Sequence, residues 1–305
     1  MYSFIKRQIL FQGLLFLLLF LASGTVAASE YEAQLRQERQ QKDHDIRLEQ
    51  IGPFTAFGQE SLKDGKAMRV AVRPDTLLLD LPTADVGIPT LEVTWKRNQG
   101  SVYVRIPMGG QFHVGRRRVG PVPMQIQPGD TIRAGRFLLQ VYRGAKTARL
   151  MAFDPSHRSR LEFRELNYFP IDKKWAVEAL VEHLSEPDTV AMTTSLGLTK
   201  YYLRHSRLHF TTPVGIDQSL TLFVPVSGEE YGFLPFSDAT SGGESYGGGR
   251  YIDLEPPEKG QKTMIVDFNR AYNPYCAYTH FYNCPIPPEE NQLSVAVEAG
   301  EKVYK

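Results

Sequence analysis

The chain has 305 residues, of which 42% are hydrophobic and 23% charged, a composition typical of globular proteins and a length sufficient for two cores. Its 35 basic and 34 acidic residues give a formal charge of +1, and removal of residues 1–28, which hold Lys6 and Arg7 but no acid, changes this to 33 − 34 = −1. A nearly neutral chain has no general attraction for nucleic acid or anionic lipid, so we expect no nucleic-acid partner.

The N-terminus has the order of a secretory signal peptide. Lys6 and Arg7 precede an apolar run from Leu14 to Leu21, and small residues follow as far as Ala28. This order predicts a signal peptide over residues 1–28, cleaved after Ala28. We therefore expect export, to the periplasm or outside the cell.

The alternative to cleavage is a retained signal anchor. A helix that spans a bilayer needs roughly 20 apolar residues, and Gln8, Gln12 and Gly13 interrupt the only stretch that offers them. No cysteine lies near the cleavage region to carry a lipid. We expect no stable membrane anchor after cleavage.

A polar helix with its lead-in is predicted over residues 29–60. Ser29 and Glu32 form an S-x-x-E capping box, and the segment that follows is rich in Gln, Arg and Glu. Its few apolar residues, chiefly Tyr31, Leu35 and Ile46, make a narrow stripe that would dock weakly. A solvated lead-in helix is favoured over a partner-binding one.

Residues 61–155 show short β-type runs separated by Pro and Gly. The runs cover residues 68–72, 76–81, 90–95, 101–106, 121–126 and 137–142. Strands of this length and spacing, without helices between them, predict an antiparallel sandwich or barrel. The hairpin at 127–142, Gln-Pro-Gly-Asp-Thr-Ile-Arg-Ala-Gly-Arg-Phe-Leu-Leu-Gln-Val-Tyr, resembles the closing strands of a forkhead-associated sandwich. The residues with which that family reads phosphopeptides have no clear counterparts in order, and the arginines at 116–118 fit a solvated turn.

A polar segment at 154–160 marks a domain boundary, and a second β-rich domain is predicted over 160–305. Its runs cover residues 175–184, 189–194, 199–204, 208–212 and 220–226. The first also fits helical spacing through Val177, Leu180, Val181 and Leu184. We predict a strand, given the β-type surroundings. The fold class is therefore mainly β, with two antiparallel sandwich-like or barrel-like units.

The C-terminal part is rich in Gly and Tyr. Its blocks read Asp-Ala-Thr-Ser-Gly at 238–242, Tyr-Gly-Gly-Gly-Arg-Tyr at 246–251, Asp-Phe-Asn-Arg-Ala-Tyr-Asn-Pro-Tyr-Cys-Ala at 267–277, Cys-Pro-Ile-Pro-Pro at 284–288 and Ala-Gly-Glu-Lys at 299–302. These blocks, with Leu-Asn-Tyr-Phe-Pro-Ile-Asp at 166–172, resemble family 1684 of the domains of unknown function from about residue 160 onward. The resemblance implies export and a β-rich domain and carries no established activity.

The only two cysteines are Cys276 and Cys284. In an exported protein this pair predicts a structural disulfide, worth roughly 2–3 kcal/mol for so short a loop. A metal site is the alternative, with His280 as the nearby further ligand. No P-loop, dinucleotide fingerprint, H-E-x-x-H or EF-hand loop occurs, so we expect no cofactor and no metal.

Candidate ligand-binding residues gather around the glycine-rich loop. Five glycines, at 242, 243 and 247–249, let the backbone approach a ligand closely. A strand ending in Val266-Asp267-Phe268-Asn269 would turn Asp267 and Asn269 to one face. The candidates are Asp238, Ser241, Glu244, Tyr246, Arg250, Asp267, Asn269, Tyr272 and Asn273.

The same residues also fit a structural clamp. Buried Asp, Arg and Asn often satisfy the backbone groups of long loops, and an Asp267–Arg250 pair could join the glycine loop to the cysteine loop. The six aromatics between 268 and 282 could stack a sugar or pack the loop.

Two catalytic patterns are weak. Gly243-Glu-Ser245-Tyr-Gly matches G-x-S-x-G, but a β-type run follows it instead of a helix, and His280 is the only later histidine. His205 and His209 lie on one face of a strand but too far apart for easy chelation.

The sequence favours an exported envelope protein that binds a small polar ligand or glycan at the Asp238–Asn273 surface. The first alternative is a hydrolase with Glu244 and Asp267 as acid and base, for which the two carboxyl groups must lie within about 10 Å. The second is a structural or assembly module that uses its N-terminal sandwich as the interface.

Overall fold

The computed structural model describes residues 29–73, 75–81, 88–107, 109–144, 147–185, 188–226 and 231–304. The signal peptide predicted over 1–28 lies outside these residues. The chain divides into two compact units. Among the described residues, the sandwich unit holds those within 44–165 and 278–283, and the seven-stranded unit holds those within 29–43, 166–277 and 284–304.

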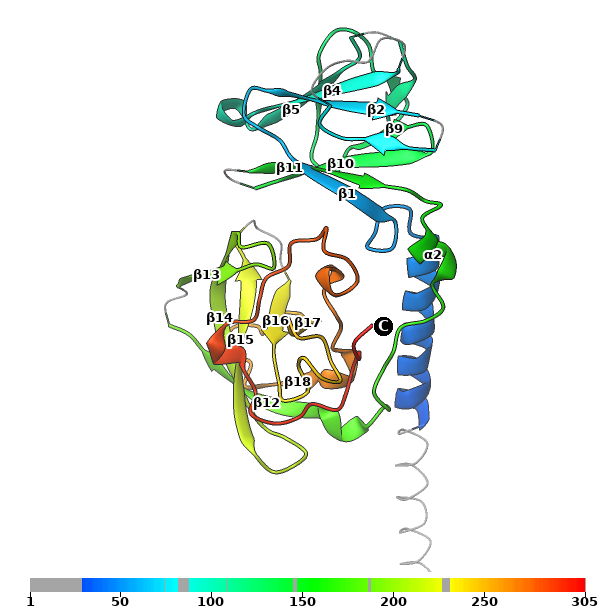
Figure 1. Ribbon diagram of the computed structural model, residues 1–305. Helices are drawn as coiled ribbons and strands as arrows, with labels where there is room; N and C mark the ends of the chain where they lie inside the picture. Colours follow the sequence, from blue (N-terminus) through cyan, green and yellow to red (C-terminus); the bar gives the residue numbers. More distant parts are fainter. Residues whose placement is uncertain are drawn as a thin grey trace, which may run out of the picture. The chain divides into compact units, whose positions relative to one another are not determined.

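The sandwich unit has two antiparallel sheets. The six-stranded sheet has the order β1-β11-β10-β9-β6-β7, and the five-stranded sheet has the order β3-β2-β4-β5-β8 (Figure 1). Their strands are β1 (Ala56–Ser61), β2 (Ala67–Val72), β3 (Leu77–Leu78), β4 (Thr90–Lys96), β5 (Ser101–Arg105), β6 (Phe112–Val114), β7 (Arg117–Arg118), β8 (Met124–Ile126), β9 (Thr131–Ala134), β10 (Phe137–Arg143) and β11 (Ala148–Phe153).

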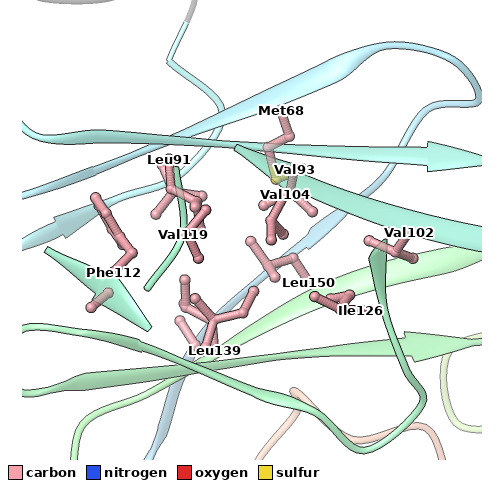
Figure 2. Close-up of a cluster of buried hydrophobic side chains, with 14 of the residues drawn as sticks. Met68, Leu91, Val93, Val102, Val104, Phe112, Val119, Ile126, Leu139 and Leu150 are labelled. Atoms are coloured by element: carbon pink, nitrogen blue, oxygen red, sulfur yellow. The ribbon is translucent and has the colours of Figure 1, made fainter. Parts of the chain in front are cut away.

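An apolar core of Val, Leu, Ile and Phe side chains fills the space between these sheets (Figure 2). Val93 and Val104 of the five-stranded sheet and Leu139 and Leu150 of the six-stranded sheet have no exposed surface. The predicted strand at 121–126 is shorter in the structure and begins at Met124. Pro121 and Pro123 lack the N–H groups that a longer ladder would require.

The seven-stranded unit is built on one antiparallel sheet of order β17-β16-β15-β14-β12-β18, with β13 added to β14. The strands are β12 (Ala176–His183), β13 (Thr189–Thr193), β14 (Thr199–Thr211), β15 (Asp217–Pro225), β16 (Gly232–Phe236), β17 (Arg250–Leu254) and β18 (Thr263–Asp267). The runs predicted at 199–204 and 208–212 form one strand, β14, with a register shift between Arg204 and Ser206 against β15.

The ambiguous segment at 175–184 is a strand, as predicted. Val177 and Ala179 face the core, while Leu180 is 63% exposed. A helix with the spacing of the alternative would have buried Leu180 beside Val177. The alternation of buried and exposed residues along 176–180 is that of a strand.

The segment from 29 to 48 is helical, as predicted, and is drawn in blue in Figure 1. Leu35 is buried to 2% exposure in the seven-stranded unit, so the stripe docks more firmly than its few apolar residues suggest. None of the helices among the described residues is long and apolar enough to cross a membrane. The second helix, α2 (Arg158–Glu162), follows β11.

Candidate functional site

Arg250, the first residue of β17, lies at the centre of the C-terminal blocks. Its side chain has no exposed surface and forms an ion pair of 2.7 Å with Asp238. Its two terminal nitrogens also donate to the carbonyl oxygens of Val297, Ala299 and Glu301. One guanidinium therefore ties the C-terminal segment to the glycine-rich loop.

Asp238 organises the loop that precedes β17. Its Oδ1 accepts from the backbone N–H and the hydroxyl of Thr240, at 2.8 and 2.6 Å, and from the N–H of Val297 at 3.2 Å. The Ser241 hydroxyl accepts from the Asp238 N–H at 3.1 Å. The acid is thus fully used by local turn formation and by Arg250.

Ser245 of the G-x-S-x-G pattern is 1% exposed, and its hydroxyl lies 2.7 Å from that of Thr240. The strand β17 follows it, as the sequence indicated. A buried hydroxyl paired with threonine has the surroundings of a structural residue.

Asp267 is the last residue of β18, and its side chain is hydrogen-bonded to the N-terminal helix. Both of its carboxylate oxygens accept from the hydroxyl of Tyr31 at 2.9 Å, and Arg270 lies 3.3 Å away. The predicted continuation of the strand to Asn269 is wrong, because residues 268–270 form a 3-10 turn. Asp267 caps this turn by accepting from the N–H of Asn269 at 3.0 Å.

The clamp pair expected between Asp267 and Arg250 does not form, because each side chain has another partner. Asp267 holds Tyr31 and the turn after β18, and Arg250 holds Asp238. Asn269 joins the first group: its amide nitrogen donates to the Tyr31 oxygen at 3.0 Å and to the Asp172 carbonyl at 2.8 Å. The polar residues therefore form two separate networks.

The other candidates lie around these networks. Glu244 is exposed and pairs with Lys302 at 3.0 Å, and the buried Asn273 donates through its amide nitrogen to the Lys302 carbonyl at 2.7 Å. The Tyr272 hydroxyl donates to Asp253 at 2.8 Å, and burial raises the pKa of Tyr272. The Tyr246 hydroxyl lies 3.6 Å from the sulfur of Cys276.

The predicted disulfide is absent, and Cys276 and Cys284 are free thiols. They are held by hydrogen bonds instead: the Cys276 N–H donates to the Cys284 sulfur at 3.2 Å, and the Cys284 N–H donates to the Ser195 hydroxyl at 3.1 Å. The hydrogen bond from Cys284 lowers the pKa of Cys276 to about 7. The described residues contain no group of three or more His, Cys, Asp or Glu that could bind a metal ion.

A cavity of about 230 Å³ lies between the N-terminal helix and the turn after β18, and we call it the helix cavity. Its lining comprises Leu35, Glu38, Arg39, Lys42, Tyr168, Asn269, Arg270, Ala271, Tyr272 and Glu301. Of the predicted residues, Asn269 and Tyr272 line it, whereas Asp238 and Arg250 do not.

Two buried polar atoms in residues that line this cavity have no hydrogen-bond partner, Nε of Arg39 and the hydroxyl of Tyr168. The Arg39 guanidinium lies over the Tyr168 ring, 4.3 Å from its centroid. Burial is the main cause that raises the pKa of Tyr168 and lowers that of Arg39. The cavity thus combines a half-buried cation with a neutral hydroxyl donor.

The sequence reasoning missed Arg39, Lys42, Tyr168 and Glu301. Tyr168 and Glu301 fall within the family-like blocks at 166–172 and 299–302, so their context was a usable signal. Arg39 and Lys42 lie in a polar helix that reads as solvated, and their spacing carries no comparable signal.

Comparison with known proteins matches the C-terminal part of the chain to one protein family. The model of a protein family of unknown function, DUF1684, matches residues 161–302. The solution NMR structure of an uncharacterised protein from Haloarcula marismortui is 40% identical, covering 47% of this chain and 79% of that one, with a TM-score of 0.40. No curated protein matches. Residues 161–302 of the chain belong to the DUF1684 family.

Proposed function

We propose that the seven-stranded unit binds a small polar molecule in the helix cavity. The observation that carries this proposal is the pair of unpartnered buried atoms, Arg39 Nε and the Tyr168 hydroxyl, in residues of the cavity wall. A buried polar atom without a partner costs about 1–3 kcal/mol. A ligand that supplies the missing acceptor would recover part of that cost.

The larger groove beside β12, β14 and β15 supports binding less well. It has a volume of about 670 Å³. However, its polar groups bond to protein: His209 to Glu182 at 2.7 Å and Thr211 to Asp217 at 2.6 Å. The Gln218 amide likewise donates to Ser294 at 3.2 Å. These groups are satisfied without a ligand.

Both walls of the helix cavity are held in place before any ligand arrives. On the helix side, Tyr31 bonds to Asp267, and Glu38 pairs with Arg270. On the opposite side, the turn at 268–270 is capped by Asp267. A cavity whose walls are fixed by their own contacts loses little entropy on binding.

A thermal-shift screen of the purified chain tests the proposal. The library should contain amino acids, organic acids, nucleosides and short glycans, and hits should then be mapped by hydrogen–deuterium exchange. We expect protection at residues 35–42 and 268–272. Hits that protect the β14–β15 groove instead, or a library without hits, would contradict the proposal.

We also propose that the protein is exported, on the basis of the charged and apolar order of residues 1–28. Cell fractionation and N-terminal sequencing of the product test this. A cleaved product that begins at Ser29 is expected, and a cytoplasmic, full-length product would overturn the idea.

Neither alternative function has an observation in its favour. Glu244 and Asp267 serve different partners, Lys302 in one case and Tyr31 in the other. In the described part of the sandwich unit, the large exposed apolar residues are Leu48, Val122 and Leu161, in three separate stretches of chain.

A further inference from the structure

The charges that line the helix cavity are unequal. Three cations, Arg39, Lys42 and Arg270, face two carboxylates, Glu38 and Glu301. Lys42 pairs with Glu301, and Arg270 pairs with Glu38. Within the described part of the chain, Arg39 has no carboxylate at ion-pair distance.

Other contacts hold Arg39 in place. One terminal nitrogen donates to the Phe169 carbonyl at 3.1 Å and the other to the Asn269 carbonyl at 3.4 Å. The Tyr168 ring lies against the guanidinium. These contacts use one N–H of each terminal nitrogen and the flat face, and among the residues described Nε is the one guanidinium nitrogen of Arg39 without a hydrogen-bond partner.

Tyr168 provides the second donor. Its hydroxyl is buried without a hydrogen-bond partner. Burial, followed by the charges of Glu301 and Asp43 and by an interaction of the hydroxyl with Glu301, raises the pKa of Tyr168, so the hydroxyl stays protonated at neutral pH. A protonated hydroxyl beside an unpaired guanidinium favours an acceptor that carries negative charge.

We propose that the molecule bound in the helix cavity is a small oxyanion, a carboxylate or phosphate group, held by Arg39 Nε–H and the Tyr168 hydroxyl. This inference rests on the proposed function. Both donor atoms have almost no exposed surface, so the two side chains shift slightly to meet the ligand. Leu35, Ala271 and the Tyr272 ring accept a compact apolar body. The volume is below the ~300–1,000 Å³ of sites for drug-sized ligands, which limits the ligand to a small molecule.

Matched probes test the charge requirement. Benzoate and benzamide share a ring and differ in charge, while inorganic phosphate tests the oxyanion without an apolar body. Calorimetric titration of the full chain should show benzoate or phosphate binding at least tenfold more tightly than benzamide. A neutral compound that binds in the cavity as well as its anionic counterpart would overturn the inference but leave the proposed function intact.

Variants locate the two donors. Arg39→Met should weaken anion binding at least tenfold, and Arg36→Met, an exposed arginine paired with Glu32 on the same helix, is the matched control. Tyr168→Phe should weaken it several-fold, because the variant loses the hydroxyl donor and keeps the ring that lies against the Arg39 guanidinium. If Arg39→Met fails to fold, the anion affinity of Tyr168→Phe tests the assignment by itself. Unchanged anion affinity in a folded variant would refute the assignment, whereas absence of binding by every probe and library compound refutes the proposed function itself.

Discussion

Arg250 and Asp238 form an ion pair of 2.7 Å in which neither side chain has any exposed surface. Removal of one partner leaves the other charge buried and unpaired, which costs about 3–5 kcal/mol. We therefore expect Arg250→Met to destabilise the seven-stranded unit by this amount. Urea denaturation measures this loss of stability, and hydrogen exchange of the β17 amides shows whether it falls on the seven-stranded unit.

Two further variants test whether the loss comes from the unpaired buried charge. The double variant Arg250→Met with Asp238→Leu should recover part of the loss, since no unpaired charge remains, although the carbonyls of 297, 299 and 301 lose their donor. Arg36→Met removes an exposed pair and should cost less than about 1 kcal/mol. An equally small effect for Arg250→Met would contradict the clamp.

Gly300 occupies a position that a side chain cannot share. Its φ is +76°, and an added Cβ would lie 2.6 Å from the Ala271 carbonyl oxygen and 2.8 Å from that of Phe268. Gly300→Ala should therefore prevent the C-terminal segment from docking and lower the melting temperature severely. Gly242→Ala is the control, because Gly242 has a φ of +84° but open space around it. It should cost only the backbone strain of about 1–2 kcal/mol, and equal effects of the two substitutions would be evidence against steric exclusion.

Tyr31 fastens the N-terminal helix to the turn after β18. Its hydroxyl donates to Asp267 and accepts from the Asn269 amide at 3.0 Å. Hydrogen bonds to charged groups contribute about 1.5–3 kcal/mol, so Tyr31→Phe should increase exchange of the amides at 29–43 about tenfold or more. Gln34→Ala, on the exposed side of the same helix, should leave that exchange unchanged. Unchanged exchange in Tyr31→Phe would show that the other contacts of the helix, such as buried Leu35 and the Lys42–Glu301 pair, hold it without this hydroxyl.

High pH should unfold the seven-stranded unit cooperatively. Burial raises the pKa of Tyr168, Tyr251 and Tyr272 in the folded state above the ordinary value of about 10. A group that is neutral and buried when folded contributes stability that is complete below the unfolded pKa and is lost as pH rises above it. We expect stability to fall above about pH 10, with tyrosinate absorbance appearing together with the loss of structure. Gradual ionisation before unfolding would contradict this.

Cys276 should react with alkylating agents at an unusually low pH. Its pKa is lowered to about 7, first by the hydrogen bond from Cys284 and also by Tyr246, whereas Cys284 is buried and its pKa is raised. Alkylation followed by peptide mass spectrometry should therefore label Cys276 first, with a rate that is half-maximal near pH 7. Tyr246→Phe should shift this midpoint upward. Faster labelling of Cys284 would refute the assignment.

The lowered pKa also gives a stability dependence of defined sign. A thiol whose folded pKa lies below its unfolded value contributes stability that is present above the unfolded pKa and lost as pH falls through the folded one. For Cys276 the window lies between the ordinary value of 9.0 and about 7. Cys276→Ser should remove this dependence.

Local pattern alone determined much of this protein. The alternation of apolar residues predicted β12 against a helical alternative, and the segment rich in Gln, Arg and Glu was correctly predicted to be a helix. The blocks near Tyr168 and Glu301 identified the family. Each of these features depends on neighbours in sequence, so periodicity or local order reveals it.

Pairing across long separations was decided only by the tertiary structure. Asp267 and Arg250 were expected to meet, yet Arg250 bonds Asp238 and Asp267 bonds Tyr31, which is 236 positions away. The helix cavity likewise joins Arg39 to Tyr168 and Asn269. Composition shows which charges a chain holds, but the choice of partner depends on which strands and turns bring two groups into the same buried space. The two arginines differ for this reason: Arg250 forms an ion pair with Asp238, whereas Arg39 in the cavity wall bonds to backbone carbonyl oxygens.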